Sequence, residues 1–508
     1  MRTDPAALGA RPGKTSPAEG DRGPQKSRSD FWGGLVAVVV LALVASACGS
    51  GPVRVGGPPP GSYVSGEVVV KYVSGVRPTS AEVAAVRGAR LQRAFRAWVA
   101  GAEFNLALVK VPEGQEAAYI EEFQRRPEVV YAEYNYRVRR LPTTAAAVAT
   151  RPLVAPRTVV RAQGVLDWTA VTDPKLTECD AAFQVTRLNG QSTSCDDQQK
   201  SASWQWDLWR MRVPQAWELA DGQGVLVAVV DEGVDRTHPE MAGQLVLPDT
   251  GCKTDPVDDD YDPSDTGGHG THVAGTVAAA VNGQGIVGVA PKAKVLPVRV
   301  LGPLGGGTTF TVSVGIVCAV EHGARVLNLS LGFAAYSRAV EDAVRSAVDA
   351  GAVVVMAAGN EFQQGNPRTY PAAFAETVRG AVGVGATAPD DRVASSSSSG
   401  PWVTVTAPGT SVYSTLPTSQ GSYGFLQGTS MASPHVAGVA ALVLSRKPAL
   451  SPAQVRNILE TTAFPPCSGY PRPDYGGAGL CGTYSPQAAG SYGWGIVDAR
   501  AAVEAAAP

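Results

Sequence analysis

Four residues of this sequence have types and positions that could together do chemistry: Asp231, His269, Asn360 and Ser430. A serine hydroxyl is a poor nucleophile near neutral pH unless a base lies within hydrogen-bonding distance. An imidazole can take the hydroxyl proton and return it to a leaving amine, while a carboxylate on the other ring nitrogen holds the required tautomer. The chain order Asp, His, Ser is one of the orders in which such triads occur. The residues therefore predict acyl transfer on Ser430.

Acyl transfer also needs hydrogen-bond donors for the oxyanion of its tetrahedral intermediate. The backbone N–H of Ser430 and the side-chain amide of Asn360 are the candidate donors, because Ser430 opens an apolar helix and Asn360 follows an apolar run. His269 also opens a helix, whose positive end disfavours an imidazolium, and the carboxylate of Asp231 offsets that effect.

Each residue also has a plainer interpretation. Taken alone, Asp231 fits a turn after a strand and His269 fits a glycine-rich loop, so only the ordered set favours catalysis. We expect His238, His272 and His435 to be structural. The five histidines show no His/Glu spacing that is typical of a zinc site.

The elements that must position these residues are predicted by short apolar runs within residues 208–505. Runs without polar alternation are typical of strands buried on both faces, as in a parallel sheet covered by helices. Ligands bind at the carboxyl ends of the strands of such sheets, so the polar residues after the runs are the candidates for a site. The runs are 225–230, 294–300, 325–331, 352–358, 378–384 and 403–407.

A smaller unit is predicted upstream, at residues 67–140. Its alternation of strands and helical stretches is typical of a small α+β domain. The expected strands are 67–73, 104–111 and 129–136, and the expected helical stretches are 80–94 and 115–126.

Long motifs around His269 and Ser430 give the chain a family resemblance. They are HGTHVAG, which starts at His269, and GTSMASPHVAG, which starts at Gly428. With these motifs, the chain from about 204 to 506 resembles the subtilisin-like serine proteases, or subtilases. Shorter motifs of the same kind are RVLG at 299–302, LNLSLG at 327–332, AAGN at 357–360, APG at 407–409 and GWGIVDA at 493–499.

This resemblance implies a serine endopeptidase with a doubly wound, mainly parallel α/β sheet in residues 204–506. It implies that Asp231 is the orienting acid, His269 the base and Ser430 the nucleophile, with Asn360 and the Ser430 backbone as oxyanion donors. It also implies a groove in which the substrate lies as an added strand. The implied groove and pocket residues are Leu301, Gly302, Ser330, Leu331, Gly332, Ala357, Ala358 and Gly359, with Glu361 and Thr369 at the pocket's base or rim.

The smaller unit resembles the inhibitory propeptide of this family, a ferredoxin-like βαββαβ domain. That resemblance implies a fourth strand at 91–98, and a tail that Ser430 cuts between about residues 137 and 160. The chain departs from the family at Glu232, where Ser or Thr usually precedes the glycine at 233. We expect the extra carboxylate to raise the pKa of His269 or to disturb a hydrogen bond of Asp231.

Charge and the N-terminal pattern bound the remaining possibilities. The 508 residues include 43 basic and 45 acidic side chains, a balance that gives no support to nucleic-acid binding through a basic surface. The apolar run 31–47 follows basic residues and ends in small ones, and VASAC at 44–48 resembles a bacterial lipobox. We therefore expect residues 1–48 to be a lipoprotein-type export signal that leaves a lipid on Cys48 at the outer face of the membrane. A secretory signal or an uncleaved anchor are the alternatives.

Two segments have no regular pattern. Gly and Pro dominate 49–66, which we expect to be a linker, and 141–203 is expected to be an irregular connector.

Acylation of Cys48 would leave six of the seven cysteines, an even number that suits an oxidising compartment. The spacing favours pairs between Cys179 and Cys195 and between Cys467 and Cys481. Cys252 and Cys318 either pair, or Cys318 is a buried free thiol.

A cluster of aspartates precedes His269. It is either a solvated acidic loop or a structural calcium site, and the acyl-transfer chemistry itself needs no cofactor. The aspartates are Asp255, Asp258, Asp259, Asp260, Asp262 and Asp265.

The sequence thus predicts an exported, monomeric serine endopeptidase that acts on polypeptides and is made as a self-processed precursor, with residues 67–140 as its own inhibitor. One alternative is a catalytically impaired, peptide-binding module, for which Glu232 is the only support. Another is a surface adhesion or scaffold protein with a protease-like domain, which would need repeats or extra interaction domains.

Overall fold

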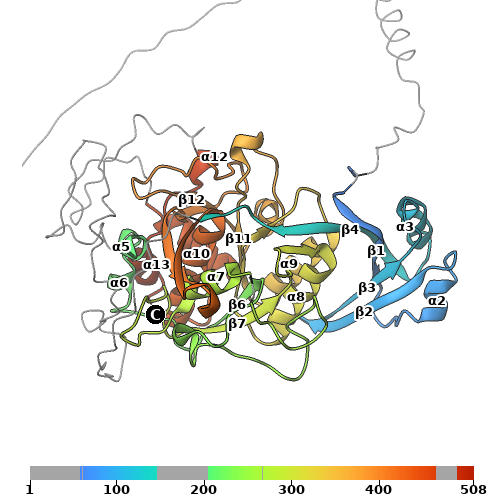
Figure 1. Cartoon of the computed structure of the whole chain (residues 1–508), viewed down its shortest axis with the longest axis horizontal. Helices are drawn as coiled ribbons and strands as arrows, with labels where there is room; N and C mark the ends of the chain where they lie inside the picture. Colours follow the sequence, from blue (N-terminus) through green and yellow to red (C-terminus); the bar gives the residue numbers. More distant parts are fainter. Residues whose placement is uncertain (1–57, 60, 146–203, 266, 465–488, 508) are drawn as a thin grey trace, which may run out of the picture. The chain divides into compact units, whose positions relative to one another are not determined.

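The computed structural model describes residues 58–59, 61–145, 204–265, 267–464 and 489–507 (Figure 1). The expected export signal, Cys48, and the pairs Cys179–Cys195 and Cys467–Cys481 lie outside these residues. Among the described residues, no helix is both long enough and apolar enough to cross a bilayer.

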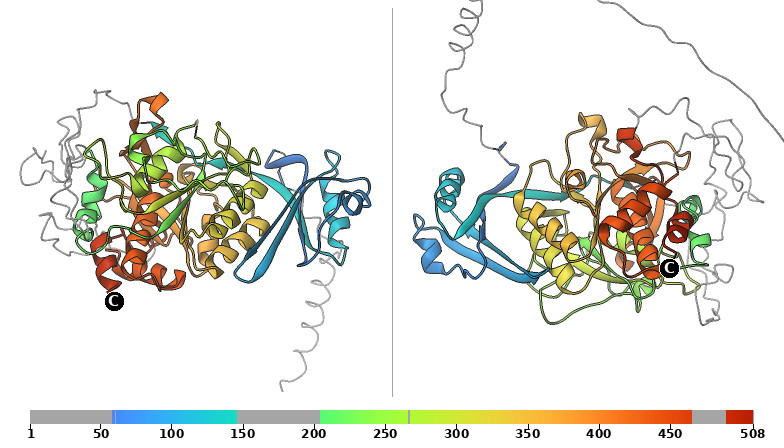
Figure 2. Two further views of the ribbon diagram at one scale, coloured as in Figure 1. Left: turned by 90° about the horizontal axis from the view of Figure 1, so that it is seen from below. Right: turned by 180° about the vertical axis from the view of Figure 1, so that it is seen from behind.

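The N-terminal domain has the element order βαββαβ. Its strands are antiparallel in the spatial order β4-β1-β3-β2, which is the ferredoxin-like arrangement. Helices α2 and α3 lie together on one face of the sheet (Figure 2). The elements are β1 (Tyr63–Tyr72), α2 (Ser80–Ala84), β2 (Arg90–Val99), β3 (Ala102–Lys110), α3 (Glu116–Gln124) and β4 (Val129–Arg140).

Two expectations for this domain were wrong in part. The helix predicted over 80–94 ends at Ala84, because the chain turns through φ values of 51° at Arg87 and 77° at Gly88. Residues 90–99 then form β2, in agreement with the strand implied at 91–98. The linker expected over 49–66 overlaps β1, whose first residue, Tyr63, packs its ring 4.7 Å from that of Tyr134.

The larger domain is built on six parallel strands in the order β13-β12-β11-β9-β6-β7. Strand order reverses between β6 and β9, so the sheet is doubly wound as predicted. Each of the six apolar runs supplies a strand, although β12 starts later than expected, after Gly380 with φ of 114°. The strands are β6 (Leu226–Asp231), β7 (Lys294–Arg299), β9 (Val326–Leu329), β11 (Val353–Ala357), β12 (Ala381–Thr387) and β13 (Val405–Pro408).

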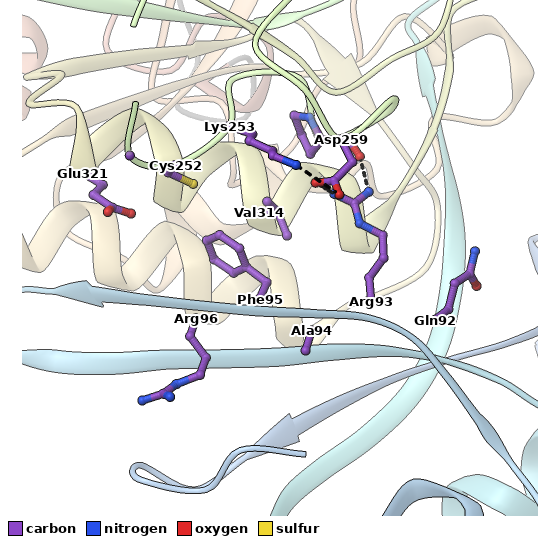
Figure 3. A pocket seen from close by; sticks show the side chains of 12 residues that line it. Gln92, Arg93, Ala94, Phe95, Arg96, Cys252, Lys253, Asp259, Val314 and Glu321 are labelled. Atoms are coloured by element: carbon purple, nitrogen blue, oxygen red, sulfur yellow. Dashed lines mark hydrogen bonds and ion pairs between the residues drawn. The ribbon is translucent and has the colours of Figure 1, made fainter. Parts of the chain in front are cut away.

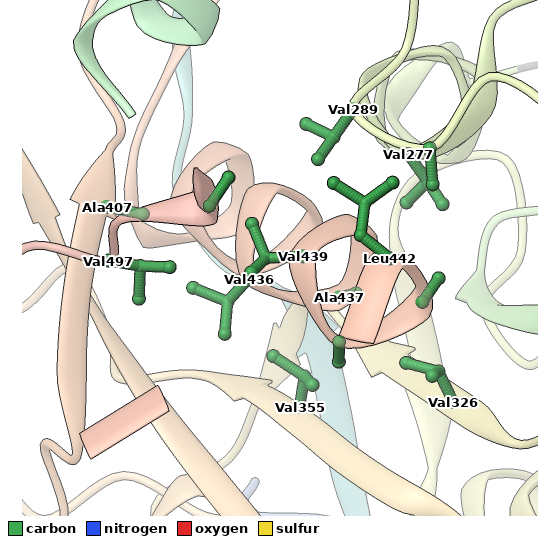
Figure 4. Packing of buried hydrophobic residues seen from close by; sticks show 14 of the residues in the cluster. Val277, Val289, Val326, Val355, Ala407, Val436, Ala437, Val439, Leu442 and Val497 are labelled. Atoms are coloured by element: carbon green, nitrogen blue, oxygen red, sulfur yellow. The ribbon is translucent and has the colours of Figure 1, made fainter. Parts of the chain in front are cut away.

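Helices cover both faces of this sheet, and alternate residues of β6 show the division. Val227 and Val229 pack against the face covered by α10, whereas Ala228 and Val230 pack against the face covered by α8. Figure 4 shows the apolar side chains of α10 among those of the surrounding strands and helices. The first face carries α7 (His269–Ala278), α10 (Thr429–Arg446), α11 (Pro452–Thr462) and α13 (Ala499–Ala505), and the second carries α8 (Thr309–Glu321) and α9 (Arg338–Asp349).

Short elements complete the larger domain. Three of them form a small antiparallel sheet in the order β14-β15-β5, in which β5 (Thr144–Ala145) belongs to the stretch expected to be irregular. The remaining elements are α5 (Trp206–Arg210), α6 (Val213–Ala216), η3 (Pro239–Met241), β8 (Gly306–Thr308), β10 (Leu331–Gly332), η4 (Phe362–Gln364), η5 (Ala372–Glu376), β14 (Val412–Thr415), η6 (Thr418–Gln420), β15 (Tyr423–Gln427) and α12 (Ala489–Tyr492).

Cys252 and Cys318 are paired, with Cα atoms 5.2 Å apart. The pairing joins the loop after β6 to α8, so the structure has a disulfide here and not a free thiol at Cys318.

The N-terminal domain contacts the larger domain at the start of two helices. Glu133 accepts hydrogen bonds from Ser337 Oγ at 2.6 Å and from the backbone N–H of Arg338 at 2.8 Å, where α9 begins. Asn135 Oδ1 accepts from the backbone N–H of Phe310 at 3.1 Å, where α8 begins. Both contacts supply acceptors to N–H groups that a helix start leaves without an intrahelical partner.

A further contact lies at the other edge of the N-terminal sheet. Arg93 of β2 binds Asp259 at 2.8 Å, and Lys253 approaches the same carboxylate at 3.4 Å. Figure 3 shows these side chains at a pocket between β2 and the loop that follows Cys252.

Candidate active site

The four residues singled out by type and spacing lie together at the carboxyl end of the parallel sheet. Asp231 is the last residue of β6, His269 the first of α7 and Ser430 the second of α10. Asn360 follows β11, after Gly359 with φ of 114°. All four side chains are buried in the presence of residues 137–145, which cross the site.

The acid and the imidazole are directly hydrogen bonded. His269 Nδ1 lies 2.8 Å from Asp231 Oδ1, which also accepts the backbone N–H of Glu232 at 2.8 Å. Burial alone would lower the pKa of His269, but the charges of Asp231 and Glu232 outweigh it and hold that pKa above its ordinary value.

The serine is turned away from the imidazole. Ser430 Oγ donates to the carbonyl oxygen of Ser330 at 3.3 Å. His269 Nε2 has no hydrogen-bond partner within the described part of the chain. In the structure, therefore, Ser430 Oγ and His269 Nε2 are not hydrogen bonded to each other.

The amide of Asn360 is fixed in one orientation. Its Oδ1 accepts from the backbone N–H of Thr429 at 2.8 Å and from Thr429 Oγ1 at 2.9 Å. Its Nδ2 donates at 2.9 Å to the carbonyl oxygen of Pro142. A Cβ at position 428 would lie 2.6 Å from Asn360 Nδ2, which explains why a glycine stands there. The side-chain N–H that acyl transfer needs as an oxyanion donor is thus hydrogen bonded to a carbonyl of residues 137–145, the segment that crosses the site.

The segment that crosses the site lies between two edges of the larger domain. On one side Arg137–Arg139 pairs with β8, and on the other Arg139 and Arg140 pair with β10. Downstream, β5 pairs with β15, just before Ser430. Leu301 and Gly302, which were expected to pair with the substrate, do not form this edge of the groove. Both residues bond to β8, and β8 pairs with the crossing segment.

The next residue of the segment, Leu141, fills the predicted pocket. Its side chain is 1% exposed, and a Cβ added at Gly332 would meet Leu141 Cδ2 at 2.5 Å and Thr369 Cγ2 at 2.9 Å. Gly359 also faces Thr369, since a Cβ there would lie 2.5 Å from Thr369 Oγ1. The predicted pocket residues Ala357 and Ala358 are both fully buried.

The remaining predicted groove residues support the nucleophile's helix. Ser330 Oγ donates to the carbonyl oxygen of Ser430 at 2.8 Å and accepts from Asn328 Nδ2 at 2.9 Å. Leu331 and Gly332 form β10 and pair with the crossing segment.

Comparison with known proteins agrees with this geometry. The model of the Subtilase family matches residues 222–495, and that of the fervidolysin N-terminal prodomain matches residues 50–135. The chain belongs to the subtilase family. Thermitase of Thermoactinomyces vulgaris is 44% identical over 256 residues, which cover 50% of this subtilase and 86% of thermitase.

Fervidolysin of Fervidobacterium pennivorans is 38% identical over 307 residues, covering 56% of this chain and 43% of fervidolysin. The crystal structure of fervidolysin, a keratinolytic enzyme related to subtilisin, aligns with a TM-score of 0.63 and 28% identity, over 88% of this chain and 62% of that one. This chain is thus a subtilisin-like serine protease with a prodomain, and it spans under half of fervidolysin's sequence.

Glu232, where this subtilase departs from its family, has a partner in the crossing segment. Arg140 Nη1 lies 3.1 Å from Glu232 Oε1. Burial, and then the charge of Asp231, raises the pKa of Glu232 to about 7. The sequence pointed to Glu232 but not to Arg140, because only the register of β4 in the groove brings the two together.

The three histidines expected to be structural, His238, His272 and His435, all have hydrogen-bond partners away from the reactive atoms. His238 Nε2 lies 2.8 Å from the carbonyl oxygen of Ser422, and His435 Nε2 lies 2.6 Å from Asp207. Burial lowers the pKa of His272 to about 3, so it is neutral near pH 7.

The acidic loop before His269 is largely matched by basic side chains. Asp255 and Asp258 both bind Arg299. Asp265 instead accepts the backbone N–H groups of Gly267 and Gly268, each at 2.8 Å, next to the start of α7. In the described ranges, no group of three or more His, Cys, Asp or Glu side chains is placed to hold a metal ion.

Proposed function

We propose that this subtilase is an exported serine endopeptidase whose Ser430 first cuts its own chain between Pro142 and Thr143. The observation that carries the proposal is the 2.9 Å hydrogen bond from Asn360 Nδ2 to the carbonyl of Pro142, two residues after a strand that is paired on both sides. A bound carbonyl on an oxyanion donor is the geometry of a substrate about to be attacked.

In the proposed step, His269 Nε2 takes the proton of Ser430 Oγ while that oxygen bonds to the carbonyl carbon of Pro142. The carbonyl electron pair moves to the oxygen, and Asn360 and the Ser430 N–H hold the oxyanion. The C–N bond then breaks, and the Thr143 nitrogen leaves with the electron pair and takes the proton from His269. Water hydrolyses the acyl-enzyme through the same base, and Asp231 stabilises the imidazolium throughout.

The Pro142–Thr143 bond suits this step better than the bond before it. Cleavage of Leu141–Pro142 would have to expel a proline nitrogen, whose tertiary amide carries no N–H and whose ring restricts the chain. The side chain of Leu141, the second residue before the proposed cut, lies in the pocket beside Gly332. This supports a preference for polypeptides with an apolar residue two positions before the bond that is cut.

Export and anchoring belong to the same proposal. The pattern of residues 31–48 supports export and acylation of Cys48. Cys48→Ser should move the protein from the membrane fraction to the medium, which immunoblots of fractionated cells would show. A variant retained in the membrane would point to an uncleaved helix at 31–47 instead.

An active-site-directed phosphonate tests the endopeptidase. The reagent should attach to Ser430 in the processed protein, as peptide mass spectrometry would locate, and it should abolish cleavage of an unfolded protein substrate. Labelling that persists in Ser430→Ala would contradict the assigned nucleophile.

A further inference from the structure

Glu232 and Arg140 form a charged pair that the proposed reaction does not use. The side chain of Glu232 is fully buried, whereas that of Arg140 is 34% exposed. Arg140 Nη1 lies 3.1 Å and 3.4 Å from the two carboxylate oxygens, and Glu232 Oε2 also accepts the backbone N–H of His269 at 3.3 Å. The carboxylate thus links the reactive histidine to the chain in the groove.

Two glycines provide the space for this pair. A Cβ at Gly305 would lie 3.0 Å from both Arg140 Cβ and Glu232 Oε1, and one at Gly267 would lie 2.1 Å from Glu232 Oε2. The backbone N–H of Arg140 donates to the carbonyl oxygen of Gly305 at 2.7 Å. The backbone therefore fixes the point from which a side chain at this position extends to the carboxylate.

Release of the cut segment removes the arginine from this site. The other charged groups that act on Glu232 are Asp231, Asp265 and His269, and the first two are acids. Removing Arg140 takes a stabilising charge interaction away from this carboxylate and leaves the repulsion of Asp231 and Asp265. A substrate that brings a new cation to Glu232 regains the interaction.

We infer that Glu232 is a specificity-determining residue, which binds an arginine placed directly before the side chain that fills the pocket beside Gly332. The inference rests on the proposed endopeptidase function. Arginine should be preferred to lysine, because a planar guanidinium can approach both carboxylate oxygens.

Arg139, the neighbouring arginine, is the matched control. It lies 3.6 Å from Glu361, and its side chain is 68% exposed. The Glu361 carboxylate is 14% exposed, and an ion pair of this length with a solvent-exposed arginine contributes little. Two adjacent arginines of the same segment therefore differ in burial of the partner carboxylate, and only Arg140 should affect specificity.

The test uses quenched fluorescent peptides with the sequence of residues 136–145, YRVRRLPTTA. The enzyme is the processed protein purified after expression of the full chain. Replacing the arginine equivalent to Arg140 by alanine should lower kcat/KM about 10- to 100-fold, as expected for loss of a charged hydrogen bond. Lysine should give an intermediate value, and alanine in place of Arg139 should change kcat/KM by less than about twofold.

The variant Glu232→Gln keeps the shape of the side chain and removes its charge. In this variant the kcat/KM ratio between the arginine and alanine peptides should fall close to one. If the wild-type enzyme cuts both peptides equally, the inference is wrong while the endopeptidase proposal stands. If the ratio is unchanged in Glu232→Gln, another residue recognises the arginine. If the wild-type enzyme cuts neither peptide nor an unfolded protein, the proposed function fails as well.

Discussion

The N-terminal domain meets the larger domain in two regions that differ in chemistry. At the starts of α8 and α9, side chains of β4 such as Glu133 and Asn135 accept hydrogen bonds from backbone N–H groups. In the groove, the backbone of residues 137–140 pairs with β8 and β10, and a carbonyl reaches Asn360. The first region can hold the domain whether or not the chain is cut, whereas the second contains the bond to be cut.

Because of this difference, the contacts at the helix starts can keep the inhibitory domain bound, whereas the contacts in the groove position the bond for cleavage. Contacts at the helix starts do not involve the Pro142 carbonyl, so cleavage leaves them intact and the domain can stay bound after the first cut. Contacts in the groove lose their covalent continuity at that cut. Changes in the groove should therefore alter the rate of processing, and changes at the helix starts should alter how long the cut domain stays bound.

The largest expected effect concerns Asn360. Asn360→Ala removes the donor that faces the Pro142 carbonyl, and loss of one oxyanion donor typically lowers kcat by about 10²–10³ with little change in KM. Processing of the precursor, followed by gel electrophoresis, should slow by a similar factor. A variant processed at the wild-type rate would remove Asn360 from the chemistry.

A smaller effect is expected at the helix starts. Glu133→Ala removes an acceptor of three hydrogen bonds, from Ser337 Oγ and the backbone N–H groups of Arg338 and Ala339. We expect the cut domain to dissociate about tenfold faster or more, seen as a shorter lag before proteolytic activity appears. Glu128→Ala is the control, because Glu128 pairs with Arg126 of its own domain. Equal lags in the two variants would contradict the separation of roles.

The smallest effect concerns the pH dependence of the free enzyme. Glu232 raises the pKa of His269 by favouring the imidazolium. The base must be neutral to act, so lowering this pKa extends activity to lower pH. Glu232→Ser should move the acidic limb of kcat/KM downward by less than about one pH unit. An acidic limb that stays in place or moves upward would contradict a carboxylate that acts on His269.

The sequence predicts most of the larger domain, because the strands and the reactive residues of that domain are marked by short patterns of neighbouring residues. Strands buried on both faces appear as continuous apolar runs. Asp231 directly follows one of these runs, and His269 and Ser430 lie within recognisable motifs. The helix expected over 80–94 extended into β2, because a half-buried Arg93 and an exposed Ala94 interrupt the alternation of apolar and polar residues. The environment of Glu232 depends on the register of a segment about 90 residues earlier, which no local pattern reports.

The central claim is that Ser430 cuts its own chain after Pro142, and the processing of Ser430→Ala tests it most directly. Loss of the nucleophile leaves the surrounding packing nearly unchanged, so the variant should fold. Wild-type protein expressed in a protease-deficient host should yield a fragment whose N-terminal sequence starts at Thr143. Ser430→Ala should accumulate uncut at that bond, as intact-mass measurement would show. Processing of Ser430→Ala at the same bond would contradict self-cleavage and assign maturation to another protease.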